Sequence, residues 1–252
     1  MPPADATALV SVEGVRKVFR SGTVALDGVD LAVGRGDFLS ILGPSGCGKS
    51  TLLRLIAGLA EPTAGTIRGT DALRRRVSFV FQEPTLMPWA TVWDNVHLPL
   101  RLVGEGREAA SPRIATTLDA VGLAGFERAY PRELSGGMRM RVSIARALVT
   151  DPELLLLDEP FAALDEITRF RLNEDLLRLW EARHWTVIFV THSVFESAFL
   201  SSRVVVMAPR PGRVVADLPV DLPYPREGAL RTSVPYATFC RGLSERLAGA
   251  MA

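Results

Sequence analysis

The chain has 252 residues, enough for one large domain or two small ones, and 48% of them are hydrophobic, which supports a sizeable core. Its 29 basic and 28 acidic residues give a formal net charge of +1, so there is no broad electrostatic case for binding nucleic acid. The sequence has only two cysteines, which predicts a reducing compartment. It has no apolar run long enough to cross a bilayer, and residues 1–7 lack a signal-peptide pattern. Any attachment to a membrane is therefore expected to come through a partner.

Short β-type segments separated by turns are expected from residue 8 to about residue 69. Within this region, residues 38–42 have the pattern of a buried strand and residues 51–57 have the apolar spacing of a helix. Between them, residues 43–51 read GPSGCGKST, with two glycines separated by four residues and followed by Lys and Ser. Strand, glycine-rich loop and helix together form the setting that a phosphate-binding loop requires.

Such a loop binds phosphate because its glycines let several backbone N–H groups converge on one anion beside the positive end of a helix dipole. Lys49 is expected to bridge the β- and γ-phosphates of a nucleotide, and Ser50 to offer its hydroxyl to Mg²⁺. Thr51 is expected next to the α-phosphate. Cys47 fills a variable position and is interpreted as inert. The other nucleotide-binding positions expected in the loop are Gly43, Pro44, Ser45, Gly46 and Gly48, with Cys47 among them.

An acidic pair follows the next strand of the expected core. The composition is helical from residue 88 to residue 150, with helical segments at 109–121 and 138–148. Residues 154–157 are four leucines, which predicts a strand buried on both faces of a parallel sheet. Asp158 and Glu159 come at its carboxyl end, where open α/β sheets bind ligands. Asp158 is expected to reach Mg²⁺ through water, and Glu159 to polarise the attacking water as a general base.

The remaining segments continue an alternation of helices and strands. A long amphipathic helix is predicted at about 165–183, and a strand at 187–191 that ends before His192. A further strand at 203–207 leads into a turn-forming segment at 208–213, and an amphipathic stretch covers 236–247. There is no internal repeat, so a single unit is expected.

Three strings in this order carry a resemblance to a known family. The phosphate loop, LSGGMRM at residues 134–140 and LLLLDEP at residues 154–160 resemble the nucleotide-binding subunit of an ATP-binding cassette (ABC) transporter. The resemblance implies that Phe19 stacks on adenine, with a place in the core as the alternative for that ring. It also implies that Gln82 contacts Mg²⁺ and the attacking water, and that His192 hydrogen-bonds the γ-phosphate.

The same resemblance implies an active site shared between two chains. Ser135, Gly136 and Gly137 match the signature loop, which contacts the γ-phosphate bound by the opposite subunit. Asp165 belongs to the loop that crosses the dimer interface. Two copies would therefore close head to tail around two ATP and Mg²⁺. Met138 departs from the Gln that many members carry, but it is a familiar variant among importer subunits.

The implied fold class is α/β, a P-loop NTPase (RecA-like) core with an N-terminal antiparallel β subdomain and an inserted α-helical subdomain. One ABC ATPase domain would span residues 8–252. Its nucleotide-binding core and β subdomain would take residues 8–87 and 151–208, and the helical subdomain with the signature loop residues 88–150. Residues 209–252 would form a short C-terminal extension.

Partners also follow from the resemblance. In this family a short cytoplasmic helix of a membrane permease docks close to the Gln82 loop. Met87, Trp89 and Trp93 are interpreted as an adaptable apolar socket for it, with plain core packing as the alternative. The strings FQEPTLMPW at 81–89 and MAPRPGR at 207–213 are similar to the nitrate/sulfonate/taurine importer ATPases. This implies uptake of a small solute brought by a periplasmic or lipid-anchored binding protein. It also implies a peripheral location at the cytoplasmic face of the inner (plasma) membrane.

Other readings of the nucleotide site are an ABC exporter subunit and a non-transport ABC ATPase. A DNA-repair ATPase of this class would need a long coiled-coil insertion, whereas about 80 residues separate the phosphate loop from the signature string. A translation-associated member would carry two cassettes. A P-loop kinase or GTPase would lack the string at 134–137 and His192.

Overall fold

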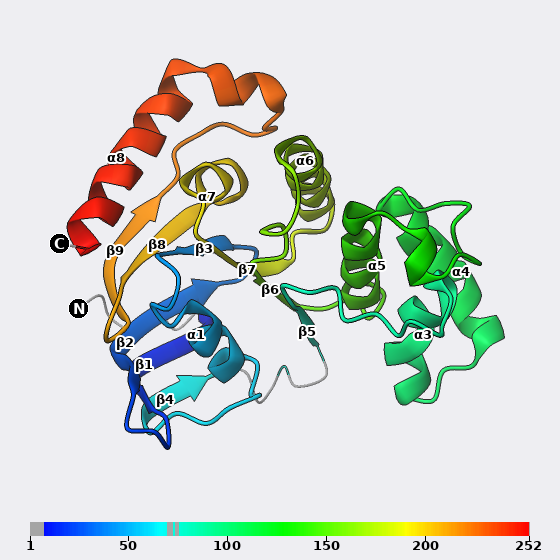
Figure 1. Ribbon diagram of the computed structural model, residues 1–252, viewed down its shortest axis with the longest axis horizontal. Helices are drawn as coiled ribbons and strands as arrows, with labels where there is room; N and C mark the ends of the chain where they lie inside the picture. Colours follow the sequence, from blue (N-terminus) through cyan, green and yellow to red (C-terminus); the bar gives the residue numbers. More distant parts are fainter. Residues whose placement is uncertain (1–7, 70–72, 74–75, 252) are drawn as a thin grey trace.

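The computed structural model describes residues 8–69, 73 and 76–251, so the expectation for residues 1–7 lies outside the described part. A six-stranded sheet with the order β5-β6-β7-β3-β8-β9 forms the centre of the molecule (Figure 1). Its strands are β3 (Phe38–Leu42), β5 (Val77–Val80), β6 (Leu154–Asp158), β7 (Thr186–Thr191), β8 (Arg203–Ala208) and β9 (Arg213–Pro219). All neighbours are parallel except β9, which runs antiparallel to β8.

The leucine run of β6 shows why the central strands are apolar throughout. Its side chains alternate between two separate hydrophobic clusters, with Leu154 and Leu156 in one and Leu155 and Leu157 in the other. All four are fully buried, because each face of the sheet is covered. The predicted double-sided burial is confirmed, and it brings the carboxyl end of β6 to the same edge as the ends of β3 and β7.

One face of this sheet is covered by α1 (Lys49–Ile56) and an antiparallel sheet of order β2-β1-β4. The strands of this second sheet are β1 (Ala8–Val18), β2 (Val24–Gly34) and β4 (Ala64–Arg68). Apolar residues of β1 and β2 share one cluster with the leucines of α1 and with Leu39 and Ile41 of β3. This packing fixes the direction of α1 and hence of the phosphate loop at its start.

A group of helices stands beside the β5 edge, between β5 and β6 in the sequence (Figure 1). It contains α3 (Val92–Leu102), α4 (Arg107–Ala120) and α5 (Gly136–Leu148), with a short 3-10 turn at Pro131–Glu133. The helical segments expected at 109–121 and 138–148 correspond to α4 and α5. The helix α3 is an additional element, which Thr91 caps by accepting the N–H of Asp94.

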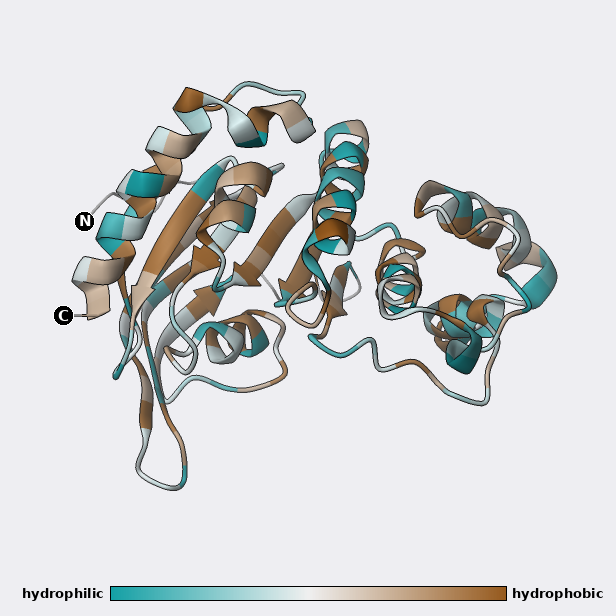
Figure 2. Cartoon of the chain, turned by 45° about the horizontal axis from the view of Figure 1, so that its top comes forward, coloured by the Kyte–Doolittle hydropathy of each residue, from teal (hydrophilic) through white to brown (hydrophobic). Residues whose placement is uncertain are grey.

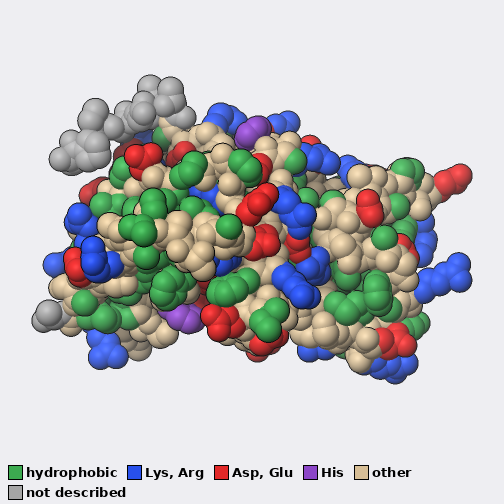
Figure 3. All heavy atoms as spheres, turned by 90° about the horizontal axis from the view of Figure 1, so that it is seen from above, with side chains coloured by type: hydrophobic (Ala, Val, Ile, Leu, Met, Phe, Trp, Pro, Cys, Tyr) green, Lys and Arg blue, Asp and Glu red, His purple; other side chains and the backbone are tan. Residues whose placement is uncertain are grey.

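The other face of the central sheet is covered by α6 (Glu166–Arg183), α7 (Val194–Leu200) and α8 (Val234–Met251) (Figures 1 and 2). Figure 2 shows the strands of the central sheet as mostly hydrophobic and the helices on this face as a mixture of hydrophobic and hydrophilic residues. No helix in the ranges that the structure describes is both long and apolar enough to cross a membrane. Basic and acidic side chains are interspersed on the face shown in Figure 3.

The C-terminal segment is packed firmly onto α7. A short 3-10 turn at Gly228–Thr232 leads into α8, and the Tyr236 hydroxyl donates a hydrogen bond to the Phe195 carbonyl at 2.8 Å. Arg226 is only 4% exposed and donates to four backbone carbonyls, those of Ala198, Phe199, Ser201 and Leu222. Strand β9 also belongs to this segment and pairs with β8. The division of the chain at residues 87, 150 and 208 stays a prediction.

Candidate functional site

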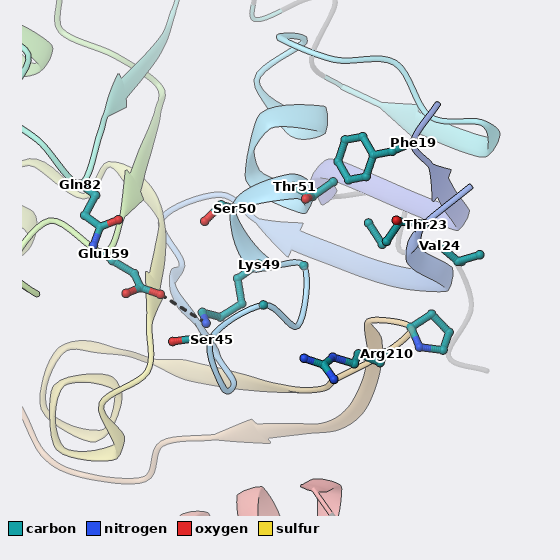
Figure 4. A pocket seen from close by; sticks show the side chains of 14 residues that line it. Phe19, Thr23, Val24, Ser45, Lys49, Ser50, Thr51, Gln82, Glu159 and Arg210 are labelled. Atoms are coloured by element: carbon teal, nitrogen blue, oxygen red, sulfur yellow. Dashed lines mark ion pairs between the residues drawn. The ribbon is translucent and has the colours of Figure 1, made fainter. Parts of the chain in front are cut away.

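A cavity of about 730 Å³ opens at the carboxyl edge of the parallel strands (Figure 4). This volume lies in the range of small-molecule sites, roughly 300–1,000 Å³. Its walls are the phosphate loop, the loop that carries Phe19, the segment after β5, the end of β6 and the β8–β9 turn. The lining residues are Phe19, Thr23, Val24, Ala25, Ser45, Gly46, Gly48, Lys49, Ser50, Thr51, Gln82, Glu159, Arg210 and Pro211.

Two glycines give the phosphate loop its curl. Gly46 and Gly48 have φ angles of +79° and +96°, in the left-handed region where other residues are strained. A Cβ on Gly48 would lie 2.7 Å from Leu26 Cδ2 and 2.8 Å from the Ala25 carbonyl oxygen, so only glycine lets the loop approach β2. No side chain caps the start of α1. This uncapped helix end, reached through a curled glycine loop, fits an anion such as a nucleotide phosphate.

The Lys49 ammonium lies at the centre of this loop. Its Nζ donates to the carbonyl oxygens of Gly43 at 2.8 Å and Pro44 at 3.0 Å, and lies 3.3 Å from Glu159 Oε1. Because the side chain is buried, its position is set by these contacts rather than by solvent. The structure therefore brings Lys49 and Glu159 into direct contact at the wall of the cavity (Figure 4).

Asp158 and Ser50 form a pair of oxygen ligands beside the lysine. The Ser50 hydroxyl donates to Asp158 Oδ1 at 2.7 Å, and Asp158 is 6% exposed at the end of β6. Burial raises the pKa of Asp158, and the hydrogen bond from Ser50 opposes that rise. A hydroxyl and a carboxylate oxygen are ligands that Mg²⁺ prefers, so this pair fits the metal that the sequence implies.

Glu159 is aimed by its backbone. It has a φ of +45°, and its N–H donates to the Val190 carbonyl at 3.0 Å, so the chain turns sharply as it leaves β6. Its Oε2 lies 3.0 Å from Nδ1 of His192, which follows β7. Gln82 lies on the same side of the cavity as Glu159 (Figure 4). The carboxylate thus stands between a lysine and a histidine, facing open space where a water molecule fits.

The opposite end of the cavity is marked by Phe19. Its ring is 46% exposed, which is inconsistent with the alternative that it belongs to the core. The Lys17 ammonium lies 5.9 Å from the ring centroid. An exposed ring at the wall of a cavity offers a flat surface for a planar base. Phe19 at one end and Glu159 at the other therefore define the long direction of the site.

The signature-loop residues lie elsewhere. Ser135 caps α5 by accepting the N–H of Met138 at 3.3 Å, and Gly136 and Gly137 form the first turn of that helix. Asp165 caps α6 by accepting the N–H of Thr168 at 2.9 Å, and this hydrogen bond lowers the pKa of Asp165. None of these four site residues lines the cavity within the described part of the chain. One chain therefore brings together only part of the predicted site.

The expected permease socket is exposed at only one of its three positions. Trp89 is 77% exposed, whereas Met87 and Trp93 are half-buried. Trp93 packs against His97, with ring centroids 4.7 Å apart. The buried Asn95 braces the Trp89 loop, because it accepts the N–H of Met87 and donates to the carbonyls of Met87, Ala90 and Thr91.

Sequence reasoning missed five residues of the cavity. Val24 and Ala25 begin β2, and Thr23 directly precedes that strand. Arg210 and Pro211 belong to the β8–β9 turn. The turn itself is evident in the string PRPG, but nothing local in that string shows that it returns to the phosphate loop. Only the pairing of β8 beside β3 carries it there.

Comparisons with known proteins agree with this geometry. A family model described as ABC transporter matches residues 26–162. An uncharacterized ABC transporter ATP-binding protein of Methanocaldococcus jannaschii is 46% identical over 240 residues, which cover 91% of this chain and 88% of that protein. The aliphatic sulfonates import ATP-binding protein of Bacillus cereus is 44% identical over 225 residues, which cover 86% of this chain and 88% of that protein.

A solved structure gives the same fold. The dimeric post-hydrolysis state of an ATP-binding cassette bound to ADP and Pi has a TM-score of 0.75 and 33% identity, over 84% of this chain and 99% of that chain. The predicted α/β P-loop NTPase fold is thereby confirmed. The chain belongs to the ABC transporter ATP-binding proteins, as an ATPase that uses ATP and Mg²⁺.

Proposed function

We propose that this ATPase energises the uptake of a small solute of the nitrate, sulfonate or taurine type through a separate permease. The observation that carries the proposal is the position of Glu159, which contacts Lys49 and His192 at one end of a cavity that has Phe19 at its other end. The similarity to a sulfonate import protein, over 86% of the chain, supports the direction of transport and the solute class.

The proposal assigns roles to the residues around the cavity that would hold the phosphates, the adenine ring and Mg²⁺. The loop N–H groups and Lys49 hold the phosphates of ATP, while adenine stacks on Phe19. When bound, Mg²⁺ neutralises part of the charge on the phosphates, and Ser50, Asp158 and Gln82 are the residues that hold it.

Glu159 accepts a proton from the attacking water, because its carboxylate lines the cavity beside Lys49. His192 lies beside that carboxylate, with its Nδ1 3.0 Å from Glu159 Oε2, and in this proposal its ring donates a hydrogen bond to the γ-phosphate. Phosphoryl transfer of this kind depends mainly on position and charge, which these contacts supply.

A second copy of the chain completes each site in the proposal. Ser135 is exposed, Gly136 is half-buried and Gly137 is buried at the start of α5, away from the cavity of their own chain. Backbone N–H groups at such a helix start suit an anion held by another molecule. Asp165 begins α6 next to them and would lie at the same interface. Two chains would close head to tail around two ATP, and the dimeric state of the similar cassette supports this arrangement.

The energy of closure passes, in this proposal, to a membrane permease. Trp89 is the exposed member of the apolar surface near Gln82, and the buried Asn95 keeps its loop in shape. A cytoplasmic helix of the permease would pack on Trp89. The chain would then be peripheral, at the cytoplasmic face of the inner (plasma) membrane, and a periplasmic or lipid-anchored binding protein would deliver the solute.

The first test compares the wild type with Glu159→Gln. ATP hydrolysis and size-exclusion chromatography in ATP and Mg²⁺ should show loss of turnover together with an ATP-dependent dimer in the variant. The control is Glu245→Gln, an exposed carboxylate on α8, which should hydrolyse ATP like the wild type. Unchanged turnover in Glu159→Gln would exclude Glu159 as the base.

The solute class is tested by growth. In cells that carry only the Lys49→Ala chain, growth on an aliphatic sulfonate or taurine as sole sulfur source, or on nitrate as sole nitrogen source, should stop. Growth on sulfate and ammonium should persist. If growth persists on all of the first three, the proposed solute class is wrong, even if the chain hydrolyses ATP.

A further inference from the structure

The turn between β8 and β9 reaches the nucleotide cavity from a side that the motifs do not cover. Arg210 and Pro211 of this turn line the cavity together with Gly46 and Ala25. Figure 4 shows Arg210 across the phosphate loop from Gln82 and Glu159. An arginine is therefore present at a wall of the cavity to which no nucleotide-binding motif assigns a residue.

Two contacts fix the position of this turn. Gly212 donates its N–H to the Ala25 carbonyl at 3.0 Å, and its own carbonyl accepts the N–H of Asp27 at 3.1 Å. A Cβ on Gly212 would lie 2.2 Å from the Cys47 carbonyl oxygen, so the turn touches the phosphate loop directly. Arg210, two residues earlier, is thereby held between the Phe19 loop and the phosphate loop.

The backbone of Arg210 is strained. Its φ is +52°, in the left-handed region that non-glycine residues seldom adopt and in which Asn and Asp are the most tolerated. No hydrogen bond or ion pair among the residues with described positions engages its guanidinium, whereas Arg213 in the same hairpin pairs with Asp27 at 2.6 Å. Strain without a local partner points to a ligand that the side chain meets.

The charge in the cavity indicates which part of the nucleotide Arg210 meets. Lys49 lies at the Glu159 end, where the terminal phosphate is expected, and Phe19 lies at the adenine end. The negatively charged α- and β-phosphates of a nucleotide bound in this direction would lie between these two ends, near Gly46. A guanidinium forms paired hydrogen bonds with phosphate oxygens. We propose that Arg210 is a nucleotide-binding residue that contacts the α- and β-phosphates of ATP; this inference rests on the proposed nucleotide site.

The test removes the guanidinium without disturbing the turn. Arg210→Asn is chosen because Asn tolerates a positive φ. Binding of a fluorescent ATP analogue with Mg²⁺, and its displacement by ATP and by ADP, should give dissociation constants that are about tenfold higher for both nucleotides, or about 1.4 kcal/mol. Arg210→Lys should recover part of the affinity. Arg213→Ala is the matched control and should bind like the wild type, and thermal unfolding should show that all variants fold.

Three results would overturn the inference. The first is unchanged affinity in Arg210→Asn, and the second is weaker binding of ATP alone, which would place the contact at the γ-phosphate. The third is an equal loss in Arg213→Ala, which would mean that the hairpin acts only through its shape. Lys49→Ala separates this inference from the proposed site. If Lys49→Ala loses binding and Arg210→Asn does not, only the inference fails; if the wild type binds no nucleotide, the proposed site itself fails.

Discussion

Arg226→Ala should strongly destabilise the protein, because the Arg226 guanidinium donates hydrogen bonds to the backbone carbonyls at the end of α7, although the two are far apart in sequence. The last carbonyls of a helix have no partner within it. Arg226 donates to three carbonyls at that end and to one of its own segment, at distances of 2.9 to 3.3 Å. Its guanidinium also lies 4.0 Å from the centroid of the Tyr224 ring.

The magnitude follows from these contacts. A buried carbonyl that loses its donor costs about 1–3 kcal/mol. Water can enter the space that the side chain leaves and replace some of the donors. Burial lowers the pKa of Arg226, which means that burying its charge is unfavourable. Removing the charge therefore offsets part of the stability that the lost hydrogen bonds contributed. We therefore expect the free energy of unfolding to fall by about 3 kcal/mol, a large share of the roughly 5–15 kcal/mol typical of a protein.

Urea unfolding followed by circular dichroism measures this loss. Arg241→Ala is the matched control, because Arg241 is exposed on α8 and should change the free energy of unfolding by less than about 0.5 kcal/mol. A loss below about 1 kcal/mol in Arg226→Ala would refute the reasoning, since it would mean that water serves these carbonyls as well as the guanidinium does.

Two further predictions concern packing and charge. Gly137→Ala should lower the free energy of unfolding by about 1–3 kcal/mol, because its Cβ would lie 2.7 Å from Thr168 Cγ2, whereas Gly136→Ala meets nothing closer than 3.5 Å and should be tolerated. Equal losses in urea unfolding would contradict this. Burial raises the pKa of Glu196, so the folded chain holds a proton that the unfolded chain releases, and stability falls as the pH rises from the usual glutamate range through the raised pKa. Glu196→Gln removes this dependence on pH. The variant should be more stable than the wild type at about pH 8 but not at about pH 4, and the gain at pH 8 should be about 1.4 kcal/mol for each unit by which the pKa is raised. An equal difference in the free energy of unfolding at both pH values, measured by urea unfolding, would contradict this prediction.

Motifs that are contiguous in sequence were predicted well, because their geometry is local. The strand at 38–42, the loop that follows it and the helix that begins at Lys49 form from neighbouring residues, and so do β6 and its two acidic residues. The contact between Lys49 and Glu159 could be expected, because parallel strands end at one edge of the sheet.

What could not be predicted depends on residues far apart in the chain. The approach of Arg210 to the phosphate loop depends on the pairing of β8 with β3 and on the contact of Gly212 with Cys47. The carbonyls at the end of α7 that accept hydrogen bonds from Arg226 lie about 25 residues earlier in the sequence. No local pattern of hydrophobic or charged residues marks either partnership, since each needs the finished sheet.

The separation of the signature loop from the cavity of its own chain has a genetic consequence. In the proposed dimer, each site takes its phosphate loop from one chain and Ser135 from the other. A cell that makes one chain defective at Lys49 and another defective at Ser135 would assemble mixed dimers in which both faults fall in the same site. The second site would then consist of two sound halves. Two alleles that are each inactive alone should therefore complement one another, because each mixed dimer keeps one complete site.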